Sequence, residues 1–194
     1  MPKRIGRVKR LLISAALAVT AMAALPSGAM AAECPLTPTT QAFAAFGDAN
    51  QYFLAPGGDF DSLKDWTVRG KAALVEDVNP LKLSANRRSV HLETGESVTS
   101  VSFCVDSTMP HLRFTAKAAG SGQLDVTVQT QVGRSTDSSG GSVSPDDHRS
   151  WHASRYVELK TDGIRDGRSG TATVSFRSQG DWHVDDVFVD PYRK

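Results

Sequence analysis

The sequence predicts an all-β protein, a two-sheet antiparallel β-sandwich or jelly roll behind an N-terminal signal peptide. Through most of the chain after residue 60, apolar and polar residues alternate with a period of two, the pattern of strands with one buried and one solvated face. Glycine, serine, aspartate and asparagine separate these segments. No window sustains helical spacing beyond a turn or two around 39–46.

The clearest strand is 124–132, in which alternate residues from Leu124 to Val132 share one apolar face. The same pattern predicts strands at 66–69, 72–76, 89–94, 97–105, 111–117, 151–159, 171–177 and 182–190. Residues 133–142 are rich in glycine and serine and low in apolar content, so we expect a mobile loop there. Strands continue on both sides of this loop, and it is therefore not a domain linker.

Residues 1–31 have the layout of a cleavable signal peptide. Five basic residues precede an apolar run from Leu11 to Leu25, and the small residues of Ala29-Met30-Ala31 offer a cleavage site. The run is shorter than the roughly 20 apolar residues of a membrane span. An uncleaved anchor is the alternative, and lipid attachment at Cys34 is disfavoured because Glu33 precedes it.

Cleavage leaves residues 32–194, a length typical of one domain, with its core at about 56–190. It also removes five of the 22 Lys and Arg residues, so 17 remain against 21 acidic residues and the net charge becomes −4. That charge argues against a nucleic-acid or anionic-membrane surface. No second apolar stretch is long enough to span a membrane, and we expect a secreted or cell-wall-associated protein.

Cys34 and Cys104 are the two cysteines of the chain. In an oxidising compartment an even pair is most simply interpreted as one disulfide. It would close a loop of about 70 residues and tie the N-terminus of the cleaved chain to the strand that holds Cys104. A catalytic thiol is the alternative, but no neighbouring residue suggests an activating base.

Two segments carry a family resemblance. The motif P-G-G-D-F-D-S at 56–62, followed by D-W-T-V at 65–68, and the closing W-H-V-D-D-V-F-V-D at 182–190 resemble the first and last strands of galactose-binding-like jelly rolls. That family includes many carbohydrate-binding modules. Residues 86–92 stand where such modules have a strand of the form G-x-x-S-L-x-L, although the glycine is absent here. The chain also resembles small secreted proteins of high-GC Gram-positive bacteria that have no assigned role.

The resemblance implies a structural calcium between the opening and closing acidic residues. Carried over to this chain, Asp61 matches the opening carboxylate, and Asp185 or Asp186 the closing one. Calcium is bound by several carboxylate and carbonyl oxygens, so the chemistry fits. Aspartate replaces the usual glutamate at position 61, which shortens its reach. The alternative is that these residues are solvated charges at a sheet edge.

Sugar-binding sites stack aromatic rings on pyranose faces, and the candidates here are Trp151, Tyr156 and Trp182. A tryptophan at the start of a strand can instead close the end of a sandwich core, and Trp66 is interpreted in that way. The polar segment 146–152 contains two histidines four residues apart. A helix would bring them together on a metal, and a strand would hold them about 13 Å apart, but a solvated loop is favoured here.

For catalysis the sequence offers none of the familiar motifs, such as G-x-S-x-G, H-E-x-x-H or C-x-x-C. We therefore expect a non-catalytic extracellular protein that binds a glycan or cell-wall polymer, with no required cofactor. Two alternatives stay open. One is a structural or protein-interaction domain without a glycan ligand, and the other is a secreted hydrolase that uses two carboxylates across a cleft.

Overall fold

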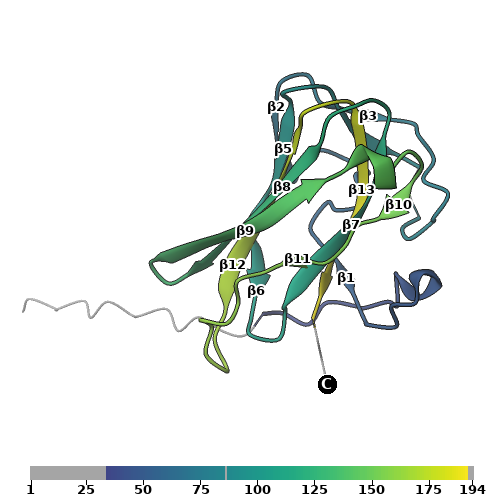
Figure 1. Cartoon of the computed structure of the whole chain (residues 1–194). Helices are drawn as coiled ribbons and strands as arrows, with labels where there is room; N and C mark the ends of the chain where they lie inside the picture. The colour runs from purple at the N-terminus through teal and green to yellow at the C-terminus, as the bar shows by residue number, and fades with distance from the viewer. Residues whose placement is uncertain (1–33, 86, 192–194) are drawn as a thin grey trace, which may run out of the picture.

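The computed structural model describes residues 34–85 and 87–191 and shows two antiparallel β-sheets packed face to face (Figure 1). The predicted all-β sandwich is therefore confirmed. The predicted signal peptide, residues 1–31, lies outside the described residues. Within the described part of the chain, no helix has the length and apolar character needed to cross a membrane.

The first sheet, called here the β13 sheet, is built around the last strand of the chain. Its order is β10–β7–β13–β4–β3, with β1 paired to β13 and β11 paired to β7. The bounds are β1 Phe53–Leu54, β3 Ala73–Val75, β4 Ser89–Leu92, β7 His111–Ala118, β10 His152–Ala153, β11 Val157–Glu158 and β13 Trp182–Asp190.

The second sheet, called the β12 sheet, has the order β2–β5–β12–β8–β9, with β6 paired to β12. The bounds are β2 Trp66–Arg69, β5 Ser97–Ser100, β6 Phe103–Val105, β8 Leu124–Val132, β9 Ser135–Val143 and β12 Gly170–Ser178. Two short 3₁₀ helices, η1 (Ala44–Phe46) and η2 (Pro145–Asp147), lie in the connections. The first falls within the turn expected around 39–46.

The core lies between the sheets and is made by alternate residues of each strand. In β7, Leu112, Phe114 and Ala116 are buried in the core, while the residues between them belong to the outer face of the β13 sheet. Trp66 is also buried, with its ring stacked on Phe60 and its Nε1 donating to the carbonyl of Gly57 at 2.8 Å. The interpretation of Trp66 as a core residue is confirmed.

The prediction of a mobile loop at 133–142 is wrong, because most of this segment belongs to β9. All nine residues of β9 pair with β8, from Val132↔Ser135 to Leu124↔Val143, and the hairpin projects at the left of Figure 1. At Gly140, φ is +137° and a Cβ atom would lie 2.0 Å from the carbonyl oxygen of Val126, so only glycine fits. Pairing to a regular strand thus overrides the weak β propensity of serine and glycine.

The predicted disulfide between Cys34 and Cys104 is present, with 5.5 Å between the Cα atoms. Cys104 lies in β6, which pairs with β12 through Thr171. The bond therefore fixes the first described residue to the β12 sheet. Two other expectations were too long: 97–105 divides into β5 and β6, and 151–159 forms only the short strands β10 and β11.

Candidate functional site

The three aromatic residues proposed from the sequence do not form one surface. Trp182 has no exposed surface, and its Nε1 donates to the carbonyl of Gly122 at 3.0 Å. Trp151 is 8% exposed and lies beside Lys117 on the outer face of the β13 sheet. Tyr156, in contrast, is 55% exposed. Of the three rings, only that of Tyr156 presents a large free surface on which a sugar could stack.

Tyr156 is held in place although it is exposed. Its hydroxyl donates to Oδ2 of Asp48 at 3.1 Å. Its ring lies over His111, with 4.0 Å between the centroids, and the guanidinium of Arg113 lies 5.2 Å from its ring centre. These contacts fix the ring without covering it, so little ordering is required when a ligand stacks on it.

Asp48 anchors this arrangement from a buried position. Besides the Tyr156 hydroxyl, its Oδ2 accepts hydrogen bonds from Tyr52 at 2.6 Å and from Arg113 Nη1 at 2.7 Å. Burial alone would raise the pKa of Asp48, but the hydrogen bonds from Tyr52 and Arg113 outweigh it and hold the pKa below its ordinary value. Arg113 also donates twice to the carbonyl of Ser154, which positions the segment that carries Tyr156.

A groove of about 460 Å³ lies beside Tyr156, between β9 and the segment 154–158. We call it the β9 groove. Its lining combines small serine and glycine residues of β9 with charged and aromatic side chains from the opposite wall. The lining residues are Val126, Gly140, Gly141, Ser142, Val143, Ser144, Asp147, His148, Ser154, Arg155, Tyr156, Val157 and Glu158. Ser139 of β9 donates to the carbonyl of Glu158 at 2.5 Å and ties the two walls together.

The chemistry of the β9 groove suits a polar ligand with an apolar face. Tyr156 offers a ring, while Arg155, Glu158 and Asp147 offer charged hydrogen-bonding groups, and all four are exposed. Serine hydroxyls complete the lining. A sugar ring has this combination of hydroxyl groups at its edge and C–H groups on its faces. Pockets for small ligands are similarly built from a few placed polar groups around an apolar surface.

Asp185 and Asp186, two of the predicted calcium ligands, form a buried pair in β13, each 1% exposed. Asn79 donates to Asp186 Oδ2 at 2.7 Å and lies 3.4 Å from Asp185 Oδ2. Burial raises the pKa of both carboxyls, and for Asp185 the charge of Asp186 raises it further. In the described part of the chain no Lys, Arg or His forms an ion pair with either, and Asp186 Oδ1 is buried without a hydrogen-bond partner.

The opening motif approaches this pair closely. The pairing of β13 with β7 shifts register between Asp185 and Phe188, which marks a bulge in β13. The carbonyl of Gly58 accepts from Val187 N in this bulge at 2.8 Å, and a Cβ atom on Gly58 would lie 2.5 Å from the Val187 oxygen. The charge of Asp59 acts on both buried carboxyls. Asp61 is exposed, and its backbone N–H donates to Asp59 Oδ1 at 3.3 Å. A buried carboxylate pair offers oxygen ligands of the kind that a hard cation such as calcium prefers.

Comparison with known proteins finds only likenesses to solved structures. No family model matches the sequence, and no curated protein matches it. Similar solved structures include the carbohydrate-binding module TmCBM61 in complex with β-1,4-galactotriose, at 18% identity and a TM-score of 0.44, covering 70% of this chain and 96% of that one. A family 11 carbohydrate-binding module from Clostridium thermocellum, in complex with a β-1,3-1,4-mixed-linked tetrasaccharide, is 14% identical with a TM-score of 0.39, covering 68% and 92%.

The enzymatically active domain of tailspike protein 4 of bacteriophage CBA120 is also similar, at 17% identity and a TM-score of 0.48. The match covers 71% of this chain but only 21% of the tailspike chain. The likeness to all three concerns the fold and locates no site. The resemblance to secreted proteins of high-GC Gram-positive bacteria stays a prediction.

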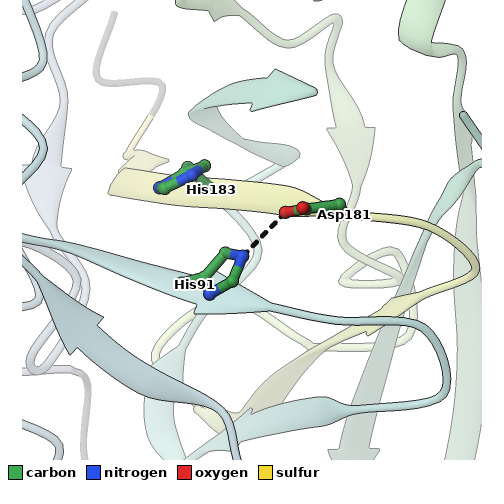
Figure 2. Close-up of side chains that lie close together, drawn as sticks. All are labelled: His91, Asp181 and His183. Carbon is green, nitrogen blue, oxygen red and sulfur yellow. Dashed lines mark hydrogen bonds and ion pairs between the residues drawn. The ribbon is translucent and has the colours of Figure 1, made fainter. Parts of the chain in front are cut away.

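A cluster that the sequence analysis did not predict lies elsewhere on the outer face of the β13 sheet. His91, Asp181 and His183 each place one ligand atom within 4.8 Å of the others, and Figure 2 shows the three side chains together. The sequence signal is the pair Asp181-x-His183 at the start of β13. It is weak, because the partner His91 is about 90 residues away and only the strand register brings it near.

Proposed function

We propose that this protein binds carbohydrate without catalysis and that the sugar lies in the β9 groove against Tyr156. The observation that carries the proposal is the exposed but fixed ring of Tyr156, 55% accessible and hydrogen-bonded through its hydroxyl to Asp48. Stacking on such a ring needs no rearrangement of the protein. The adjoining Arg155, Glu158 and serine residues supply partners for sugar hydroxyls.

We further propose that the protein acts outside the cell. The Cys34–Cys104 disulfide supports this, because such bonds persist in oxidising compartments and are rare in the cytosol. The basic and apolar leader at 1–31 supports it as well. Cell-wall polymers and other extracellular glycans are then the ligand class within reach.

A structural calcium is proposed at the Asp185–Asp186 pair, with Asp59 as the third carboxylate. Bound there, the ion would accept oxygen ligands from two buried carboxyls that form no ion pair with a Lys, Arg or His of the described residues. It would hold the β13 bulge against the opening loop at Gly58. This role is structural, and the proposed sugar site does not depend on it.

The test is a binding screen against a glycan array and insoluble polysaccharides, with wild-type protein and Tyr156→Ala. We expect saturable binding of at least one glycan by the wild type and at least a tenfold loss in Tyr156→Ala, because truncating an aromatic anchor costs roughly 2 kcal/mol. Val101→Ala is the matched control, since Val101 is also exposed but does not line the β9 groove.

Three outcomes would contradict the proposal. Absence of binding to every glycan would leave a structural or protein-interaction domain. Release of reducing sugar that is abolished by Asp147→Asn or Glu158→Gln would instead identify a hydrolase, because these two carboxylates line the same groove. Binding that Tyr156→Ala leaves unchanged would move the sugar site elsewhere.

A further inference from the structure

The histidines of the cluster in Figure 2 are brought together by strand register. His183 in β13 pairs directly with His91 in the antiparallel neighbour β4. Directly opposed residues have Cβ atoms about 5 Å apart on the same face of the sheet. Asp181 stands two residues before His183, so it returns to that same face. Two imidazoles and one carboxylate therefore converge on the outer face of the β13 sheet.

The distances suit a transition-metal site. One ligand atom from each of the three residues lies within 4.8 Å of the others. His91 Nε2 is 2.7 Å from Asp181 Oδ1, and the two imidazole centroids are 4.9 Å apart. A tetrahedral zinc ion with bonds of about 2.0–2.1 Å spaces its ligand atoms at about 3.3 Å. Small side-chain rotations would bring the three groups to that spacing.

A second layer of contacts positions His183. Asp77 Oδ2 lies 3.2 Å from Nδ1 of His183, and Ser89 Oγ lies 3.4 Å from the same nitrogen. Lys117 contacts Asp77, and the Trp151 ring lies next to both Lys117 and His183, at 5.6 and 6.3 Å. A carboxylate bonded to a ring nitrogen is the common way in which metal-binding histidines are oriented.

The cluster is also reachable. The side chains of His91, Asp181 and His183 are 28%, 46% and 15% exposed. A metal held by them would keep a further position open to solvent or to an oxygen of a ligand.

Two nitrogen donors and one carboxylate favour zinc over calcium, which prefers an all-oxygen set. We propose that His91, Asp181 and His183 bind Zn²⁺ with one coordination position open. This site differs in donors from the Asp185–Asp186 pair and does not rest on the proposed sugar binding.

The test is calorimetric titration of the full chain with ZnCl₂. For this titration the protein is prepared without an affinity tag, dialysed against a chelator and kept in a non-coordinating buffer. We expect saturable binding of one ion per chain. His91→Ala and Asp181→Asn should each weaken it at least tenfold, since each removes a ligand. His152→Ala is the matched control, because His152 is exposed and lies outside the cluster, and it should bind as the wild type does.

A positioning role for Asp77 gives a second readout. Asp77→Asn should weaken zinc binding about tenfold, which is typical for loss of a residue that orients a ligand. Co²⁺ bound in place of Zn²⁺ should give the visible absorption of an ion with a low coordination number, and this absorption should be lost in Asp181→Asn. Thermal unfolding without metal checks that each variant is folded. If His91→Ala proves to be unfolded, the test rests on Asp181→Asn, which changes the most exposed of the three ligands. No saturable binding by the wild type, or equal affinity in His91→Ala, Asp181→Asn and wild type, would overturn the proposal.

Discussion

The hydroxyl of Tyr156 lies 3.1 Å from Oδ2 of Asp48, a residue 108 positions earlier in the chain. This contact joins the N-terminal segment to the loop between β10 and β11 on the outer face of the β13 sheet. The same oxygen of Asp48 accepts hydrogen bonds from Tyr52 and Arg113. One buried carboxylate thus fixes both an aromatic platform and the strand beneath it.

Removing the Asp48 charge should strongly destabilise the protein. Asp48→Ala leaves the Arg113 guanidinium, whose side chain is 11% exposed, without its ion-pair partner. Breaking a buried pair on one side costs about 3–5 kcal/mol. Asp146→Ala is the control, because its ion pair with Arg149 is largely exposed and should contribute less than about 1 kcal/mol. Urea unfolding measures both, and equal losses would contradict a structural role for Asp48.

Calcium should stabilise the protein through Asp185. We expect Ca²⁺ at 100 times its dissociation constant to raise the free energy of unfolding by about 2.7 kcal/mol. Asp185→Asn and Asp59→Asn should abolish that gain, whereas Asp61→Asn should keep it, since the Asp61 side chain is exposed. The measurement is thermal unfolding with calcium and with chelator. Identical unfolding of the wild type in both conditions would contradict the proposed calcium site.

The contribution of His148 to stability should become unfavourable as the pH drops below about 6.5. Burial, reinforced by neighbouring His152, lowers the pKa of His148 from its ordinary value of 6.5. Below pH 6.5 the unfolded chain therefore takes up a proton more readily than the folded chain, and folding is disfavoured. His148→Gln should remove this contribution between pH 5 and 7. The lowered pKa values of His111 and His183 act in the same direction as His148, and the raised pKa values of Asp185 and Asp186 act in the opposite one.

The control for this prediction is His152→Gln, since His152 is exposed. Urea unfolding at several pH values gives the slope of the free energy of unfolding against pH. This slope should be closer to that of the wild type in His152→Gln than in His148→Gln. A wild-type slope that His148→Gln does not change would show that His148 is not buried as a neutral group.

Loss of the disulfide should cost about 4 kcal/mol. Cys34 and Cys104 are 70 residues apart in sequence, and closing a loop of that length restricts the unfolded chain strongly. The double variant Cys34→Ser/Cys104→Ser, compared with wild type under oxidising conditions, measures this contribution. Adding a reductant should destabilise the wild type by a similar amount and leave the double variant unaffected.

The sequence predicted the parts of the fold that alternate regularly. Strands 124–132 and 182–190 were predicted at their observed bounds because each carries a continuous apolar face. β9 was missed because serine and glycine give no such face, and its structure comes from pairing with β8. The disulfide was predictable from the cysteine count alone.

The site was harder to predict because it depends on exposure and register. The sequence offered Trp151, Tyr156 and Trp182 as aromatic candidates and favoured Trp151 over Trp182, and only packing separates the exposed tyrosine from the buried tryptophans. Alignment of the opening motif points to Asp61, whereas the charge of Asp59 acts on both buried carboxyls, which the sequence pattern did not indicate. The pairing of His183 with His91 depends on a strand register that periodicity does not specify.

The most direct test of the central claim is NMR mapping of the sugar site on isotope-labelled protein with the tightest glycan from the binding screen. We predict that the amide shifts concentrate at residues 140–144 and 154–158, the two walls of the β9 groove, and disappear in Tyr156→Ala. Shifts concentrated on another surface, with these segments unchanged, would contradict the assignment of carbohydrate binding to the β9 groove.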